Sequence, residues 1–367
     1  MKKFLVLCFV MLFSIINCYS QELDNIIPSQ VGIVQDLEYV DLNDSEIAQV
    51  KQEVEIKLLN GEFKNEIITV DNILTGNPYY DIKLKKGAKV ILHVEETEDG
   101  FVYSIDNVKR SGILIWLSVL FCALLIYVGK KKGLYSLISI ALTCLLIVFL
   151  LSPMILVGIN PVFGALLIAV VSTAITMYLV GGLNKKSTSA ILGCTLSICF
   201  ASILAYMTVK IASLNGFTGE QSMFLYSAKP QLDFVGLAIA MIILATLGAV
   251  MDVAMSIAST INEIYSVDNS KSVKELFKSG MNVGRDIIGT MANTLILVYM
   301  GSSLPLILLA NNIDFTKFTN LAPVVTEIAS ALIGSCAIVI CVPLTAIVAS
   351  NLIKNNSHKI DFTGFDS

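Results

Sequence analysis

The sequence predicts a polytopic α-helical membrane protein of about seven spans, with a small β-barrel or OB-like domain at its N-terminus. The 367 residues are 55% hydrophobic and 15% charged, with a mean hydropathy of +0.76, whereas soluble domains carry about 25% charged residues. Long apolar runs fill the chain from Gly112 onward. Segment 21–111 instead holds 18 acidic and 9 basic residues, which predicts a separate polar domain.

Segment 1–20 fits a signal peptide. Two lysines precede an apolar run that is too short to span a bilayer comfortably, and the small residues Cys18 and Ser20 fit the −3 and −1 positions of a cleavage site. An uncleaved signal anchor would give the same topology. Both alternatives place the polar domain outside the membrane.

The polar domain is predicted to be rich in β-strands. Apolar and charged residues alternate along Val50–Leu58, and segments 67–70, 90–94 and 101–105 are further short apolar runs. Several short strands separated by turn signals indicate a small barrel or sandwich, with an OB-like barrel as one form. His93 has no partner for metal binding or catalysis, so we expect a surface histidine.

Seven apolar runs in segment 112–352 are long enough to span a bilayer, which takes about 20 residues. They are 112–129, 134–152, 161–181, 189–209, 233–257, 286–309 and 323–352. Lysines gather on alternate loops, and the positive-inside rule therefore places those loops and the tail 353–367 in the cytoplasm. The same rule places the N-terminal domain outside.

Two irregular segments are predicted within this membrane domain. Segment 301–305 contains Gly301 and Pro305 and predicts a kink in the outer half of the sixth span. Segment 268–285 predicts an amphipathic connector on the cytoplasmic surface, opened by a capping box of Ser272 and Glu275. A short outer turn is expected between the second and third spans.

The polar residues of the fifth and sixth spans form the candidate site. Asp252 and Ser256 share one helical face of the fifth span. Arg285, Asp286 and Asn293 enter the membrane with the sixth span at a similar depth. Ionisable groups within a bilayer indicate function by default, so this cluster could bind a solute, proton or cation. The alternative is an Asp252–Arg285 salt bridge that only fixes the helix pair.

Other kinds of site are not supported by the sequence. Neither histidine lies in a span, no P-loop or dinucleotide fingerprint occurs, and no Cys/His cluster suggests zinc. We therefore expect no enzyme activity, no cofactor, no metal and no nucleic-acid partner. The cysteines are expected to be packing residues. Glu327, a few residues inside the outer boundary of the seventh span, is expected to be solvated and inert.

Three segments carry a resemblance to a known family. GAVMDVAMSIAS at 248–259, the segment from Ser279 to Pro305, and GINP at 158–161 resemble the YibE/F-like membrane proteins of bacteria. The resemblance implies a multi-pass protein of the plasma membrane with an N-terminal extracytoplasmic β domain. It supplies no reaction and no established site residues, and transport is the usual suggestion for this family.

Two functions are compatible with these features. The first is a transporter or permease for a small solute or ion, with Asp252, Arg285 and Asn293 in the path. The second is a non-transporting membrane protein whose outer β domain binds an envelope component or a partner protein. In both, the bilayer is a partner, and a second copy or another membrane protein is compatible with the sequence.

The predicted topology can be tested with reporter fusions. Because lysines mark the cytoplasmic loops, fusions at three of those loops should report cytoplasm, at Lys132, Lys186 and Lys278. Fusions near three opposite loops should report the outside, at Asn160, Gly219 and Asn312. One reversed reporter among the short loops would contradict the seven-span arrangement.

Overall fold

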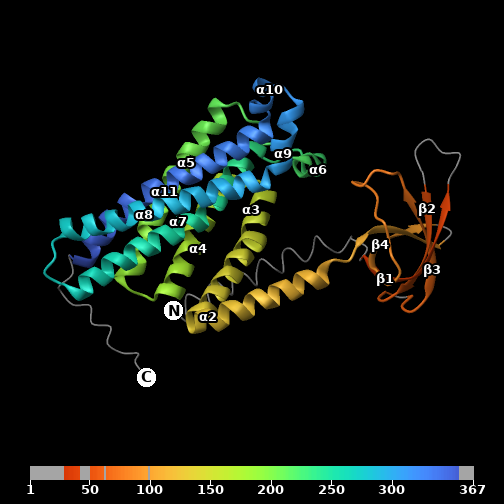
Figure 1. The fold of residues 1–367 in the computed structure, drawn as a ribbon, viewed down its shortest axis with the longest axis horizontal. Helices are drawn as coiled ribbons and strands as arrows, with labels where there is room; N and C mark the ends of the chain where they lie inside the picture. Colours follow the sequence, from red (N-terminus) through yellow and green to blue (C-terminus); the bar gives the residue numbers. More distant parts are fainter. Residues whose placement is uncertain (1–28, 42–49, 62, 98–99, 355–367) are drawn as a thin grey trace. The chain divides into compact units, whose positions relative to one another are not determined.

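The computed structural model describes residues 29–41, 50–61, 63–97 and 100–354 (Figure 1). The predicted signal segment 1–20 and most of the tail 353–367 lie outside these residues. The chain divides into two compact units, Ser20–Tyr127 and a unit that contains Val128–Ser367. We describe each unit by itself.

The N-terminal unit contains a nearly closed, five-stranded antiparallel barrel. Its strands are β1 Gln30–Asp41, β2 Val50–Leu58, β3 Ile67–Leu74, β4 Lys89–Thr97 and β5 Gly100–Val108. They lie in the order β3-β2-β1-β4-β5, and β3 also contacts β5, which nearly closes the sheet. The prediction of a small β-barrel is confirmed. The sequence reasoning found four of these strands and missed β1, which pairs with both β2 and β4.

The barrel interior contains one buried polar side chain, Gln52. The alternation of β2 buries Val54, Ile56 and Leu58 as predicted, and it also buries Gln52 completely. A buried amide is tolerated only when its polar atoms have hydrogen-bond partners. Gln52 Oε1 accepts hydrogen bonds from Leu84 N at 3.2 Å and from Asn72 Nδ2 at 2.8 Å, and Gln52 Nε2 donates to Leu84 O at 3.4 Å.

These bonds fix a loop between β3 and β4 to the barrel, and Asp81 stabilises the loop internally. The Asp81 carboxylate accepts hydrogen bonds from Thr75 N, Thr75 Oγ1 and Gly76 N. Partial desolvation alone would raise the pKa of Asp81, but these hydrogen bonds and nearby Lys83 outweigh it and lower the pKa. The loop thus carries Leu84 into the core, where it is 2% exposed.

We expect Gln52→Leu to destabilise the barrel. The substitution keeps the volume but removes the Gln52 partners of Leu84 N and Leu84 O, which costs ~1–3 kcal/mol, while Asn72 keeps its hydrogen bond to Ile82 O. Residues 21–111 expressed alone should give a β-type circular dichroism spectrum, and urea unfolding of this fragment measures the loss. Glu55→Gln on the exposed face of β2 is the matched control and should change stability by less than about 0.5 kcal/mol. Equal stability of the two variants would contradict the role of Gln52.

Among the described residues, five helices are long and apolar enough to cross a membrane, or six if a bent pair forms one further span. The five are Ser111–Leu156, α4 Pro161–Gly181, α5 Lys185–Ile211, α7 Phe234–Val267 and α11 Ala322–Lys354. The first begins in the N-terminal unit and comprises α2 Ser111–Leu146, a π-helical segment Ile147–Leu151 and α3 Ser152–Leu156. The bent pair is α8 Val273–Ser302 with Leu304–Asn312.

The count of seven spans depends on how the first helix is divided. A straight helix of 46 residues would be about 69 Å long, more than twice the ~30 Å of a bilayer core. Lys130 lies near its middle with φ 49° and ψ −131°, which is not helical. Residues 112–129 and 134–152, the first two predicted spans, lie on either side of Lys130.

The kink of the sixth span is confirmed, whereas the predicted connector is not a separate helix. α8 ends at Ser302, and α9 Leu304–Leu309 follows at an angle of 64°. Ser272 and Glu275 form the predicted capping box, but the helix that they open continues without interruption to Ser302. Residues 273–285 therefore form the first part of α8, and Leu276, Gly280 and Gly284 are buried on its inner face.

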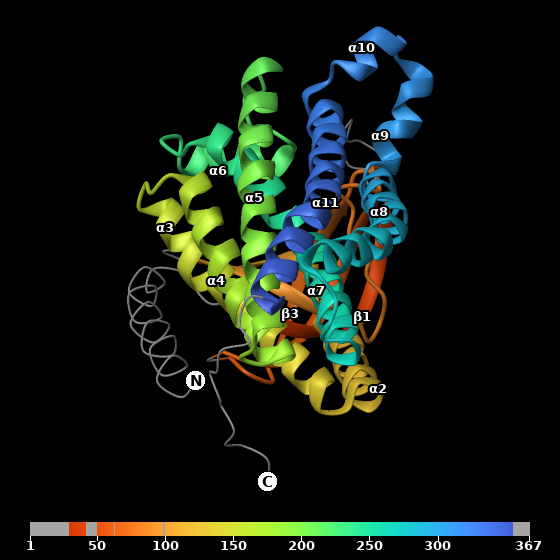
Figure 2. The same cartoon turned by 90° about the vertical axis from the view of Figure 1, so that its left-hand side faces the viewer.

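The membrane unit is packed around α11, which contacts α5, α7 and α8. Figure 2 shows α11 lying between α5 and α8. Close approach depends on small residues: a Cβ at Gly193 of α5 would overlap Thr345 of α11, and one at Gly284 of α8 would overlap Val342 of α11. Small residues at such contacts let the backbones approach, which drives helix association in a bilayer.

Candidate functional site

The polar residues predicted on α7 lie on its outward face. Asp252 and Ser256 are both exposed, whereas the neighbouring Val253, Ala254 and Ile257 are buried. The Met255 side chain packs against Gly181, the last residue of α4. Asp252 therefore lies within about one helical turn of the α4–α5 loop, at the end of the bundle that carries the predicted cytoplasmic lysines.

The polar residues predicted on α8 are exposed as well. Arg285, Asp286 and Asn293 all lie on the outer side of this helix. Arg285 Nη1 donates a hydrogen bond to Asn282 Oδ1 at 3.3 Å, which is a contact within α8. The structure thus brings these three residues to one exposed strip and does not bury them between helices.

Asp252 and Arg285 do not form the salt bridge that we considered. Gly284 packs against Ile257 across the α7–α8 hairpin, so Arg285 lies level with Ser256 and about one helical turn, ~5 Å, from the level of Asp252. Among the residues that the structure describes, no ion pair or hydrogen bond joins Asp252 to Arg285. The helix-pair salt bridge is therefore wrong.

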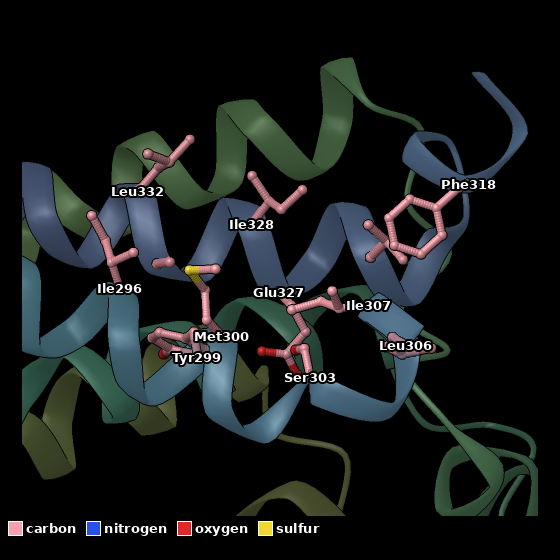
Figure 3. Close-up of a pocket in the computed structure, with 12 residues that line it drawn as sticks. Ile296, Tyr299, Met300, Ser303, Leu306, Ile307, Phe318, Glu327, Ile328 and Leu332 are labelled. Atoms are coloured by element: carbon pink, nitrogen blue, oxygen red, sulfur yellow. The ribbon is translucent and has the colours of Figure 1, made fainter. Parts of the chain in front are cut away.

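A cavity of about 320 Å³ lies at the bend between α8 and α9 (Figure 3). α8, α9 and α11 provide most of its walls, and Phe318 of α10 Phe315–Thr319 adds an aromatic ring. The lining is mostly aliphatic. It comprises Ile296, Tyr299, Met300, Ser303, Leu306, Ile307, Phe318, Val324, Glu327, Ile328, Ala331 and Leu332.

Glu327 is the acidic residue of this cavity, and sequence reasoning discounted it. Its side chain points from α11 toward Ser303 of the α8–α9 bend (Figure 3). Glu327 Oε2 and Ser303 Oγ are both buried and lack a hydrogen-bond partner. Tyr299 lies close enough for electrostatic interaction with Glu327. Glu327 is therefore only partly exposed and is not fully solvated.

The break in the helix places Ser303 in the cavity. Ser303 has φ −92° and ψ 9°, and Pro305 at the start of α9 cannot donate a backbone hydrogen bond into the preceding turn. The chain bends by 64° there, and α9 and α10 then fold back toward the start of α11. The sequence showed the bend, but it did not show that the bent segment covers Glu327.

These features define a multi-pass helical membrane protein with an N-terminal β-barrel domain. The chain belongs to the YibE/F family: a model described as YibE/F-like protein matches residues 117–355, and a model for the YibE/F family N-terminal domain matches residues 17–108. Comparisons with curated proteins and with solved structures found no match. Within the described part of the chain, no three His, Cys, Asp or Glu side chains gather as metal ligands.

We expect Asp252→Asn and Arg285→Gln to act independently on stability. The two groups are not in contact, so the double variant should show the sum of the single effects within about 0.5 kcal/mol. The measurement is thermal unfolding in detergent of four purified proteins: wild type, the two single variants and the double variant. A double variant that is much more stable than the two single effects together predict would show that Asp252 and Arg285 do interact.

Proposed function

We propose that this protein moves a small solute or ion across the bacterial plasma membrane, and that the cavity at Glu327 lies on the path. One observation carries the proposal: a broken helix lines a cavity that holds a buried carboxylate oxygen without a partner. The alternative of a purely structural cavity leaves that oxygen unexplained.

A broken helix and a buried carboxylate are both energetically unfavourable within a bilayer. Non-helical backbone within a bilayer is tolerated where it is buried in protein or lines a cavity, and membrane transporters use broken helices to build substrate sites. A carboxylate within a span is costly unless it is paired or hydrated, so it indicates function by default. Glu327 and the Ser303 bend combine both features in one place.

The proposed orientation follows from the loop charges. The α4–α5 and α7–α8 loops carry Lys185, Lys186 and Lys271, which favours the cytoplasm for that end of the helices. α9 and α10 lie at the other end of the helix bundle (Figure 1). The cavity would therefore lie near the outer surface, and the β-barrel domain would also be outside.

The role of the predicted polar strip stays a prediction. Asp252, Ser256, Arg285, Asp286 and Asn293 are exposed and do not line the cavity at Glu327. They would contribute to a path only if a second copy or another membrane protein covered this side of α7 and α8. The proposed solute site therefore rests on Glu327 instead.

Tracer exchange in proteoliposomes tests the proposed function. Vesicles with wild-type protein, with Glu327→Gln and without protein are compared for protons, alkali cations, organic amines, amino acids and inorganic anions. At least one class should exchange faster with wild-type protein, and Glu327→Gln should slow it by about tenfold or more, since a charged hydrogen-bond partner is lost. Glu263→Gln, at an exposed acid near the far end of α7, is the matched control.

A failed screen would favour the alternative function. If folded wild-type protein exchanges no class faster than empty vesicles do, transport is contradicted. The outer β-barrel would then be the functional part, and binding of an envelope component or a partner protein to residues 21–111 would be the next measurement.

A further inference from the structure

We infer that the cavity at Glu327 binds a small organic cation, an ammonium with apolar substituents, through the Glu327 carboxylate. The inference deepens the proposed function and rests on it for its physiological meaning. It depends on three properties of the lining: its charge, its oxygen content and its aromatic walls.

The charge of the lining selects against anions. Glu327 is the one acid, and no lysine, arginine or histidine lines the cavity. A bound anion would meet a carboxylate with no positive group to offset it, in surroundings where charges interact more strongly than in water. A cation in the same place would pair with Glu327, whose Oε2 atom has no other partner.

The oxygen content selects against Ca²⁺ and Mg²⁺. Hard cations such as Ca²⁺ take about six to eight oxygen ligands, and Mg²⁺ demands a near-ideal octahedron. The side chains of this lining offer the two oxygens of Glu327, the Ser303 hydroxyl and the Tyr299 hydroxyl, and the remaining side chains are apolar. A bare metal ion would be undercoordinated, and a hydrated one would place its water against aliphatic walls.

The apolar walls suit the substituents of an ammonium ion. Ile296, Met300 and Leu332 can contact alkyl groups, and the rings of Tyr299 and Phe318 can lie against a cation by cation–π interaction. A volume of about 320 Å³ is at the lower end of small-molecule sites, which span roughly 300–1,000 Å³. Ser303 Oγ, also without a partner, could bond a hydroxyl or N–H group of the ligand.

Choline and its neutral isostere 3,3-dimethylbutan-1-ol provide the test. The two molecules share a shape and differ in one positive charge. Binding of each is measured by equilibrium dialysis against the full-length protein in lipid nanodiscs, in sodium chloride at physiological ionic strength. We expect choline to bind at least about tenfold more tightly than the neutral alcohol. Both ligands make the same apolar contacts, and choline adds an ion pair with Glu327.

Two variants separate the binding site from general effects of charge. Glu327→Gln should remove the preference for choline and leave binding of the alcohol unchanged, because the shape of the cavity is kept. Glu263→Gln removes an acid outside the cavity and should leave both affinities unchanged. The thermal stability of each variant shows whether it has folded.

Three outcomes would overturn the inference, and a fourth concerns transport only. Equal binding of the two molecules would identify an apolar site, such as one for a lipid tail. Choline binding that survives Glu327→Gln would place the site elsewhere. No choline binding, together with proton exchange that requires Glu327 in vesicles, would leave the transport proposal intact and identify the proton as the cargo. Choline binding without exchange of any solute would contradict transport alone.

Discussion

Close packing of α11 against its neighbours is the constraint on which the membrane unit depends. Helices in a bilayer gain little from the hydrophobic effect, so their association relies on close contact and on small residues. Gly193 and Gly284 let α5 and α8 approach α11 until side chains such as Thr345 and Val342 fill the space of a missing Cβ. Any larger residue at either glycine would push its helix away from α11.

The same packing explains why the cavity lies where it does. From Gly280 to Leu295, α8 keeps buried contacts with α7 and α11. Leu295 is the last fully buried residue of α8, and the helix itself ends at Ser302. The chain then bends, so α8 and α11 enclose the space around Glu327 instead of filling it.

Local signals in the sequence predicted much of the fold. The Ser272–Glu275 capping box and the kink at Pro305 depend on neighbouring residues alone, and both are present. β1 was missed because a bulge between Val34 and Asp36 shifts the alternation of its side chains in mid-strand. The sequence did not show that residues 273–285 are part of α8. Leu276 and Gly284 bury one face of this segment against α7 and α11. An amphipathic pattern fits such a buried face as well as it fits a helix on the membrane surface.

The exposure of the candidate site residues depends on how the helices pack, which no single helix of the sequence shows. Asp252 lies inside an apolar run, which marks it from the sequence, yet its exposure and its distance from Arg285 depend on the direction in which α7 and α8 face. Glu327 lies near the start of its helix, where an acid is ordinarily solvated, and only the fold shows that α9 and α10 return over it. A carboxylate at a span end costs little in water and much in a covered apolar cavity. The segment that folds back toward the start of α11, and not the position of Glu327 along the span, therefore decides how far this carboxylate is removed from water.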